Sequence, residues 1–327
     1  MQEHPFARYI RPLGRGPGRA RNLTGEEAQE AMRMILRGDV RGEQLGAFLM
    51  LMRYKRETAE ELAGFTLALR EILPTPSFGV DLDWSSYASG RSRGQPWFLL
   101  AALLLARNGL RVFLHGASPV ADQHSLTEQG AAILGIRRCR KGEEADRAMA
   151  AENIAFMNLG DLCPPLHHLL CLRPVLGLRS PANALARLFN PMRAPAQFVG
   201  VFHPGFRSLQ QQAAHILEQP AFAVLKGAGG EAERRPEKTC ALHVSIGEEM
   251  REIALPPLIG KEQSGRQDHA LSDLRALWNG DITDAHAEAT VIATAAIGLL
   301  LCKRAATPHE ADEMAATLWQ TRHPLRQ

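Results

Sequence analysis

From about residue 78 onward, short β-type runs alternate with helical stretches, and this pattern constrains the fold most. The runs are RVFLHG, NIAFMNLG, AQFVGVFHP, AFAVLKG and CALHVSIG. Helical stretches separate or follow them at residues 97–108, 143–151, 207–218, 284–304 and 308–320. The alternation predicts a mostly parallel sheet covered by helices, in a large α/β domain over residues 76–327. The strands end in loops marked by Gly or Pro, where α/β proteins bind their ligands.

The first 75 residues carry helical patterns only. The segments TGEE, from Thr24, and TAEE, from Thr58, are capping boxes ahead of apolar stripes of helical period. A further helix is expected between them, through EQLGAFLMLMRYKR. Three short helices bury their apolar stripes only by docking on another part of the chain. We therefore predict a small helical domain over residues 1–75, joined by helices from about residues 164–190.

The charged residues are segregated along the chain. The 38 Lys and Arg residues nearly balance the 35 Asp and Glu residues, for a net charge of +3. Residues 1–21 nevertheless hold five arginines against one acid, and residues 84–121 and 162–217 hold four and five arginines with no acid. Segregation of this kind predicts an anionic partner. The alternative is that acids and bases interdigitate once the chain has folded.

Cysteine usage and hydropathy predict a cytoplasmic protein. The five cysteines form no Cys-x-x-Cys pair, which is typical of reduced thiols. Two uncharged apolar runs, residues 96–106 and 289–302, are shorter than the roughly 20 residues that cross a bilayer. No charged-then-apolar signal peptide begins the sequence. We therefore expect no membrane partner.

The segment CPPLHHLLC is a candidate metal cluster. It places Cys163, His167, His168 and Cys171 within nine residues, and a helix brings positions i, i+4 and i+8 to the same face. However, four side chains of one short segment cannot readily surround a tetrahedral ion, and two prolines mark a helix start there. We therefore predict no metal site here, and solvated or packed side chains instead.

Two long segments resemble a known family. NLTGEEAQEAMRMILRGDVRGEQLGAFLMLMRYKRETAEELAGFTLALRE resembles the N-terminal helical domain of the anthranilate phosphoribosyltransferases, members of glycosyltransferase family 3 and of the wider nucleoside phosphorylase-like group. RSPANALARLFNPMRAPAQFVGVFHPGF resembles the family segment that runs through an Arg and an Asn-Pro to a strand ending in His-Pro. The resemblance covers nearly the whole chain. It implies a small helical domain, a large α/β domain, a cleft between them and commonly a homodimer.

The phosphate-binding parts of the family pattern are altered in this chain. The enzymes cradle the pyrophosphate of phosphoribosyl pyrophosphate with a Gly-Thr-Gly-Gly-Asp loop, whereas the matching stretch here is SSYASGRSRG. The family's Lys-His-Gly-Asn-Arg-Ser segment is matched by LHGASP, which keeps His115 and Gly116. We expect His115 to satisfy a backbone group at the end of its strand.

The Asp-Glu pair that holds magnesium in the enzymes is also changed. The corresponding GAGGEAERRPEK offers Glu231 and Glu233, with Arg234 and Arg235 close by. We expect these guanidinium groups to compete for the two carboxylates and to oppose a divalent cation. With three parts of the site missing, the two glutamates and the His-Gly pair are interpreted as a vestigial cleft. We predict no catalytic residue and no cofactor, with magnesium only if a transferase function holds after all.

The departures follow a pattern of their own. SSYASGRSRG, CPPL and the region around GGEAERRPE look like the branch of the family typified by YbiB, whose members bind DNA. In that branch a dimer presents basic grooves that hold nucleic acid with little sequence preference. The predicted function is therefore sequence-nonspecific binding of DNA, or of RNA, by a catalytically inactive homodimer.

Elementary electrostatics agrees with this hypothesis. Arginines spread over a face displace counterions from phosphates without contacting bases. No helix-turn-helix, zinc-finger or aromatic RNA-stacking motif is present to read a sequence. Two other functions stay open: a phosphoribosyltransferase in which arginines replace the glycine amides, and a small-molecule sensor that uses the old cleft.

Seven arginines are candidate phosphate contacts. Two lie in the altered phosphate loop, where a solvated loop is the alternative, and three lie in a Gly- and Pro-spaced arm, where disorder is the alternative. Two more lie where the enzymes grip the anthranilate carboxylate, and there internal ion pairs are the alternative. In the same order, they are Arg91 and Arg93; Arg15, Arg19 and Arg21; and Arg179 and Arg187.

Overall fold

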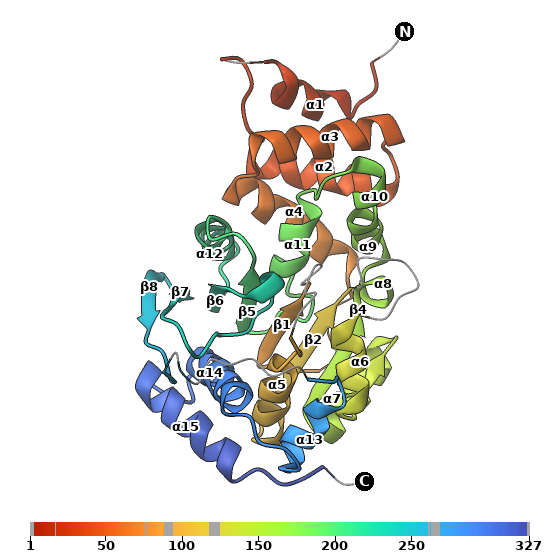
Figure 1. Ribbon diagram of the computed structural model, residues 1–327. Coiled ribbons are helices and arrows are strands. Elements are labelled where there is room, and N and C mark those ends of the chain that lie inside the picture. The colour runs from red at the N-terminus through yellow and green to blue at the C-terminus, as the bar shows by residue number, and fades with distance from the viewer. Residues whose placement is uncertain are drawn as a thin grey trace.

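An eight-stranded sheet forms the centre of the computed structural model, in the order β3-β4-β2-β1-β5-β6-β7-β8 (Figure 1). The strands are Leu82–Ser86 (β1), Val112–Gly116 (β2), Arg138–Cys139 (β3), Ile154–Asn158 (β4), Ala196–Val201 (β5), Ala221–Lys226 (β6), Cys240–Ile246 (β7) and Glu249–Leu255 (β8). Neighbours from β3 to β6 are parallel, and β7 and β8 add an antiparallel edge. The predicted mostly parallel sheet is confirmed.

The structure describes residues 3–16, 18–74, 76, 78–87, 94–117, 125–260, 262 and 269–325. Arg91 and Arg93 lie outside these residues, so the predictions made for them stay predictions.

The five apolar runs named from the sequence correspond to β2, β4, β5, β6 and β7, so β1, the two-residue strand β3 and β8 were missed. All five residues of β1 are buried, but three of them are polar, so the segment LDWSS carries no apolar run. Strand β8 is an edge strand whose side chains are mostly exposed, and three of the seven residues of its sequence EMREIAL are charged. Residues 80–85, VDLDWS, alternate apolar and polar, so β1 does carry the signal of a strand, whereas EMREIAL shows no such alternation.

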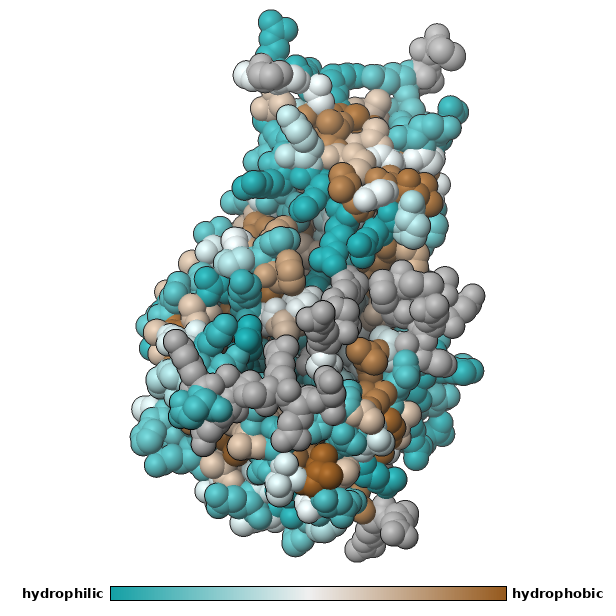
Figure 2. Space-filling view, in the orientation of Figure 1, coloured by the Kyte–Doolittle hydropathy of each residue, from teal (hydrophilic) through white to brown (hydrophobic). Residues whose placement is uncertain are grey.

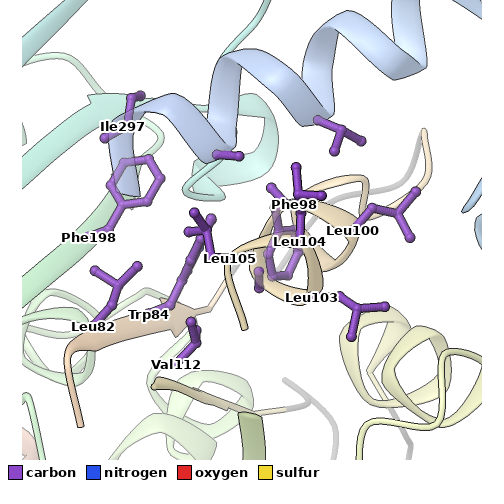
Figure 3. Packing of buried hydrophobic residues seen from close by; sticks show 14 of the residues in the cluster. Leu82, Trp84, Phe98, Leu100, Leu103, Leu104, Leu105, Val112, Phe198 and Ile297 are labelled. Carbon is purple, nitrogen blue, oxygen red and sulfur yellow. The ribbon is translucent and has the colours of Figure 1, made fainter. Parts of the chain in front are cut away.

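Helices cover both faces of the sheet. The α/β part contains Phe98–Arg107 (α5), Leu126–Ile133 (α6), Gly142–Glu152 (α7), Phe206–Ile216 (α12), Asp273–Asn279 (α13), Ala285–Leu301 (α14) and Pro308–Gln320 (α15). These bounds confirm the helical stretches expected from the sequence. Figure 3 shows the core beneath α5 and α14, where Trp84 of β1 and Phe198 of β5 pack edge to face with ring centroids 4.9 Å apart.

The helical part stands at the other end of the molecule (Figure 1). It contains Ala7–Gly14 (α1), Gly25–Arg37 (α2), Gly42–Lys55 (α3) and Ala59–Ile72 (α4), and the later helices Leu159–Leu162 (α8), Pro164–Cys171 (α9), Arg173–Leu176 (α10) and Ala182–Leu188 (α11) lie beside it. Both predicted capping boxes are present. Helices α2 and α4 approach closely, since a Cβ at Gly64 would lie 2.2 Å from the Gly25 carbonyl oxygen.

A single hydrophobic core connects the helical part to the sheet. It joins residues of α1 to α4 with residues of α9, α11 and α12 and with the side chains of β5 and β6 that face them. The helices from the middle of the chain therefore pack in the core that the N-terminal helices need. The boundary between residues 75 and 76 stays a prediction, because this core is continuous across it.

Candidate functional site

The loop after β6 carries two buried carboxylates. Glu231 Oε2 accepts a hydrogen bond from the Ser86 hydroxyl at 2.9 Å. Glu233 Oε2 accepts one from the backbone N–H of Phe98, also at 2.9 Å, and Phe98 is the first residue of α5. A carboxylate at that place satisfies an amide that has no partner inside the helix, and it offsets the helix dipole. The acidic pair therefore ties β1, α5 and this loop together.

The arginines next to these carboxylates turn away from them. Arg234 is buried, and its guanidinium donates to Asp312 Oδ1 at 2.8 Å and to the Pro256 carbonyl at 2.6 Å. Arg235 pairs with Glu237 at 2.5 Å. The prediction that these guanidinium groups compete for Glu231 and Glu233 is therefore wrong. Neighbours in sequence project in different directions from an extended loop, and each arginine finds its own acid.

His115 belongs to a buried chain of polar side chains. Its Nδ1 lies 2.7 Å from the Tyr87 hydroxyl, and its Nε2 lies 3.3 Å from the Asp83 carboxylate. The expectation that His115 satisfies a backbone group is therefore wrong, because side chains of β1 and its end fill that role. Burial, and then the Asp83 charge, raises the pKa of Tyr87 well above its ordinary value. At the following Gly116, a Cβ would lie 2.5 Å from the Ser86 carbonyl oxygen, so no side chain fits.

A basic cavity of about 400 Å³ opens beside α10, next to the carboxyl end of β5. Its described lining contains no Asp or Glu but three arginines: Arg53 from α3, Arg173 from α10, and Arg179. Burial, followed by the charges of Arg173 and Arg53, lowers the pKa of Arg179. Arg53 and Arg173 form no ion pair with any residue that the structure describes. We call this space the basic cavity.

Of these three arginines, only Arg179 was a sequence candidate. Arg173 lies in the same acid-free tract, so the tract as a whole was the signal that could have found it. Arg53 lies in the last turn of α3 beside Lys55, and nothing in the sequence shows that it faces a distant loop. The tertiary contact between α3 and the residues after α10 brings it to the cavity.

Arg187 is a different case from Arg179. Its side chain is buried, and it donates to the carbonyl oxygens of Gly200 at 2.9 Å, Asn183 at 2.5 Å and Tyr87 at 2.7 Å. Burial lowers the pKa of Arg187 to about 10. The alternative to phosphate binding was an internal ion pair. The geometry favours an internal role for Arg187, but its partners are backbone carbonyls and not an acid. Its contact with phosphate stays a prediction.

The arginine-rich arm follows α1, at the end of the molecule farthest from the sheet (Figure 1). Arg15 and Arg19 are exposed. Arg21 is also exposed but pairs with Glu27 through both terminal nitrogens, at 2.6 and 2.7 Å. The separation of charges along the sequence is thus partly undone here, since Glu27 on α2 neutralises one of the three candidates.

Within the part of the chain that the structure describes, no group of three or more His, Cys, Asp or Glu side chains could hold a metal ion. In the CPPLHHLLC segment, Cys171 Sγ lies 3.6 Å from His167 Nε2. All five cysteines are free thiols. No helix among the described residues has the length and apolarity to span a membrane.

Comparisons with known proteins define the class. The glycosyl transferase family helical bundle domain matches residues 7–72, and the glycosyl transferase family a/b domain matches residues 98–321. The chain therefore belongs to this glycosyl transferase family.

Its relatives include two kinds of protein. The uncharacterized protein YbiB of Escherichia coli is 29% identical over 75% of this chain and 78% of its own. An anthranilate phosphoribosyltransferase of a Geobacillus species is 27% identical over 93% of this chain and 92% of its own. The crystal structure of the anthranilate phosphoribosyltransferase from Thermus thermophilus matches with a TM-score of 0.74 at 21% identity, over 97% of this chain and 94% of that one. This structural match confirms the fold.

Proposed function

We propose that this protein binds DNA without sequence preference, with RNA as the alternative polymer, and that it transfers no phosphoribosyl group. The observation that carries the proposal is the basic cavity, where Arg53 and Arg173 line a space whose described lining holds no acid, and neither arginine forms an ion pair with a described residue. Guanidinium groups gathered in this way repel one another, and a polyanion relieves that repulsion while it releases its own counterions. Exposed Arg15 and Arg19 are further cations along the helical part.

The acidic loop supports the absence of transfer chemistry. In α/β proteins the amides at a helix N-terminus after a strand are the place for a phosphate. At α5 the Glu233 carboxylate already accepts the Phe98 amide, so a second anion there would meet a like charge. A pyrophosphate would therefore bind poorly at this helix.

The acidic pair also does not fit magnesium. Mg²⁺ keeps several coordinated waters and requires near-octahedral geometry. Glu231 and Glu233 are only 2% and 7% exposed, and each already accepts a hydrogen bond from the chain. We therefore assign no metal-dependent step to them, and propose that the protein needs no cofactor.

A phosphoribosyltransferase is the second candidate, and the Geobacillus relative favours it because the similarity spans 93% of this chain. Release of pyrophosphate from phosphoribosyl pyrophosphate, with anthranilate and Mg²⁺, tests it directly. We expect no turnover even at high enzyme concentration. Turnover at a steady rate would establish the transferase.

The DNA-binding proposal is tested by a salt titration. Fluorescence anisotropy with a random-sequence duplex, between about 50 and 200 mM salt, gives the association constant. We expect its logarithm to fall linearly with the logarithm of salt concentration, with a slope of about 0.9 per phosphate contacted. A flat response, or no binding at the lowest salt, would remove the proposal.

We also propose that the protein is a homodimer in the cytoplasm. On the face shown in Figure 2, hydrophobic atoms gather over α2 and α10, and α10 carries Val175, which is 81% exposed. Exposed apolar side chains close together are typical of protein interfaces. Free thiols are typical of a reducing compartment. Light scattering during size-exclusion chromatography should give twice the chain mass, and the mass of a single chain would contradict the dimer.

A further inference from the structure

The basic cavity has an aromatic wall as well as charge. Phe202, the residue after β5, lines it and is 49% exposed. Leu178, which lines it too, is 58% exposed. The ring of His203 stands perpendicular to that of Phe202, with centroids 4.8 Å apart. A phosphate needs only the arginines, so a flat apolar group is the partner that uses these side chains.

A smaller recess of about 70 Å³ adjoins the basic cavity, and the two share four lining residues: Arg53, Arg179, Phe202 and His203. Glu57 and Gln210 line the recess, and both are buried. Glu57 Oε2 and Gln210 Oε1 have no hydrogen-bond partner among the residues that the structure describes. Gln210 is held in place by its amide nitrogen, which donates to the Ala184 carbonyl at 2.9 Å. Buried polar atoms without partners destabilise a protein, so these two oxygens mark a place for a donor from outside the chain.

We propose that the basic cavity takes one unstacked nucleobase of a bound strand. The base stacks on Phe202 opposite Leu178, its polar edge points into the recess, and the flanking phosphates lie on Arg53 and Arg173. This inference rests on the proposed nucleic-acid binding and adds the way in which the cavity is filled.

The chemistry of the recess suits every base. Burial raises the pKa of Glu57 despite the charge of Arg53, which favours the neutral carboxyl, and a neutral carboxyl both donates and accepts hydrogen bonds. Gln210 offers an acceptor, and each of the four bases carries an N–H donor on its pairing edge. Stacking on an aromatic ring is also tolerant of sequence, because every base has a π-face. A base pocket is therefore compatible with binding that has no sequence preference.

The base must leave its own stack to enter. In an intact duplex the pairing edge is occupied and both faces of the base are stacked, so a strand end, a single strand or a flipped-out nucleotide presents the group that fits. The recess is too small for a whole base, which places the ring in the basic cavity and only its edge in the recess.

The test compares two single strands of equal length in the same salt. One is oligothymidylate, and the other carries abasic sites throughout, which keeps the phosphates and removes the bases. With the full chain, anisotropy should give about tenfold tighter binding of oligothymidylate. Equal affinity for the two strands would overturn the base pocket and leave DNA binding intact. No binding of either strand would also overturn the base pocket, and the proposed function would fall with it only if the random-sequence duplex did not bind either.

Two variants locate the effect. Phe202→Ala should bring the two affinities together while the salt slope of the abasic strand stays unchanged, and Leu178→Ala should reduce the difference in part. Met250→Ala is the matched control, because Met250 on β8 is 44% exposed and lines neither space. An unchanged preference in Phe202→Ala, with the melting temperature of the wild type, would place the base elsewhere and overturn the proposal.

A competition experiment distinguishes a nucleic-acid strand from a small ligand as the natural occupant of the cavity. Thymidine monophosphate carries the same base and phosphate, but not the neighbouring phosphates that Arg53 and Arg173 would share. We expect it to displace the oligomer only at concentrations at least about a hundredfold above that of unlabelled oligothymidylate. Displacement at equal concentration would show that the cavity is built for a small anionic aromatic molecule, and would overturn the inference of a strand.

Discussion

The loop after β6 and the basic cavity both lie at the carboxyl ends of parallel strands, but they carry opposite charges. The charged groups of the two regions also differ in whether they have partners inside the protein. In the acidic loop, Glu233 is held by the α5 amide and Arg234 by Asp312, so the charges serve the packing of the chain. In the basic cavity, Arg53 and Arg173 lie together, and no acid is among the lining residues that the structure describes. Charged side chains that pair with other groups of the protein stabilise the fold, whereas charged side chains without such partners are available to a ligand. The comparison predicts that changes in the loop alter stability, and changes in the cavity alter binding.

The largest effect is expected for Arg234→Ala. Arg234 is buried and donates to Asp312 and to the Pro256 carbonyl. Removing one partner of a buried ion pair leaves the other charge unpaired, and we expect the free energy of unfolding to fall by about 3 kcal/mol. Urea unfolding followed by circular dichroism measures it. Arg37→Ala, which removes an exposed arginine, should leave the midpoint unchanged, and equal midpoints for the two variants would contradict the scaffold role of the loop.

Glu233→Ala is expected to lower the free energy of unfolding by about 2 kcal/mol, because the first amide of α5 loses its acceptor in a buried place. Glu233→Gln keeps an oxygen acceptor and should lose less. Differential scanning calorimetry of the two variants measures the order. If Glu233→Ala were as stable as the wild type and gained affinity for pyrophosphate, the carboxylate would be a removable plug and not a part of the scaffold.

In the basic cavity, Arg53→Gln combined with Arg173→Gln should weaken binding of random DNA by about tenfold and lower the salt slope by about two. The melting temperature should not fall, because neither side chain forms an ion pair with a described residue. Arg37→Gln on α2 is the control that removes an exposed arginine outside the cavity. A loss of stability without a change in affinity would reverse the comparison between the two regions.

The smallest effect concerns pH. Burial alone lowers the pKa of His269, but its hydrogen bonds to Asp284 and Asp273, at 2.8 and 3.0 Å, raise it above the ordinary value of 6.5. The protonated ring therefore stabilises the fold fully below about pH 6.5, and this contribution is lost as pH rises through the folded pKa. We expect less than about 1 kcal/mol, because solvent screens the partly exposed pair. Unfolding free energies between about pH 5.5 and 8.5 should show the decrease in the wild type. A similar decrease in His269→Gln would assign it to another group.

Much of the fold could be predicted from the sequence because its signals are local. The capping boxes at Thr24 and Thr58 and the helix at 97–108 depend on residues a few positions apart, and each is present. The burial of the polar face of strand β1 could not be predicted in this way. Its polar residues are buried only because Asp83 meets His115 and Ser86 meets Glu231, and these partners lie 32 and 145 positions away.

The candidate site was predictable only in part, for the same reason. The acid-free tract from 162 to 217 pointed to a cationic surface, and two of the three cavity arginines come from it. It could not separate Arg179, which lines the cavity, from Arg187, whose donors go to backbone carbonyls. The tract also could not show that Arg53, which belongs to α3, lines the same cavity.

The sequence by itself determined which segments are helices, which alternation builds the sheet, and where arginines lack acids nearby in the chain. The tertiary structure alone decided which charges neutralise one another. Arg234 and Arg235 turned away from Glu231 and Glu233, while Arg53 and Arg173 came together in a cavity whose described lining holds no acid. The physical reason is that periodicity and capping act over a few residues, whereas an ion pair forms wherever packing brings two side chains within about 4 Å, however far apart they lie in the chain.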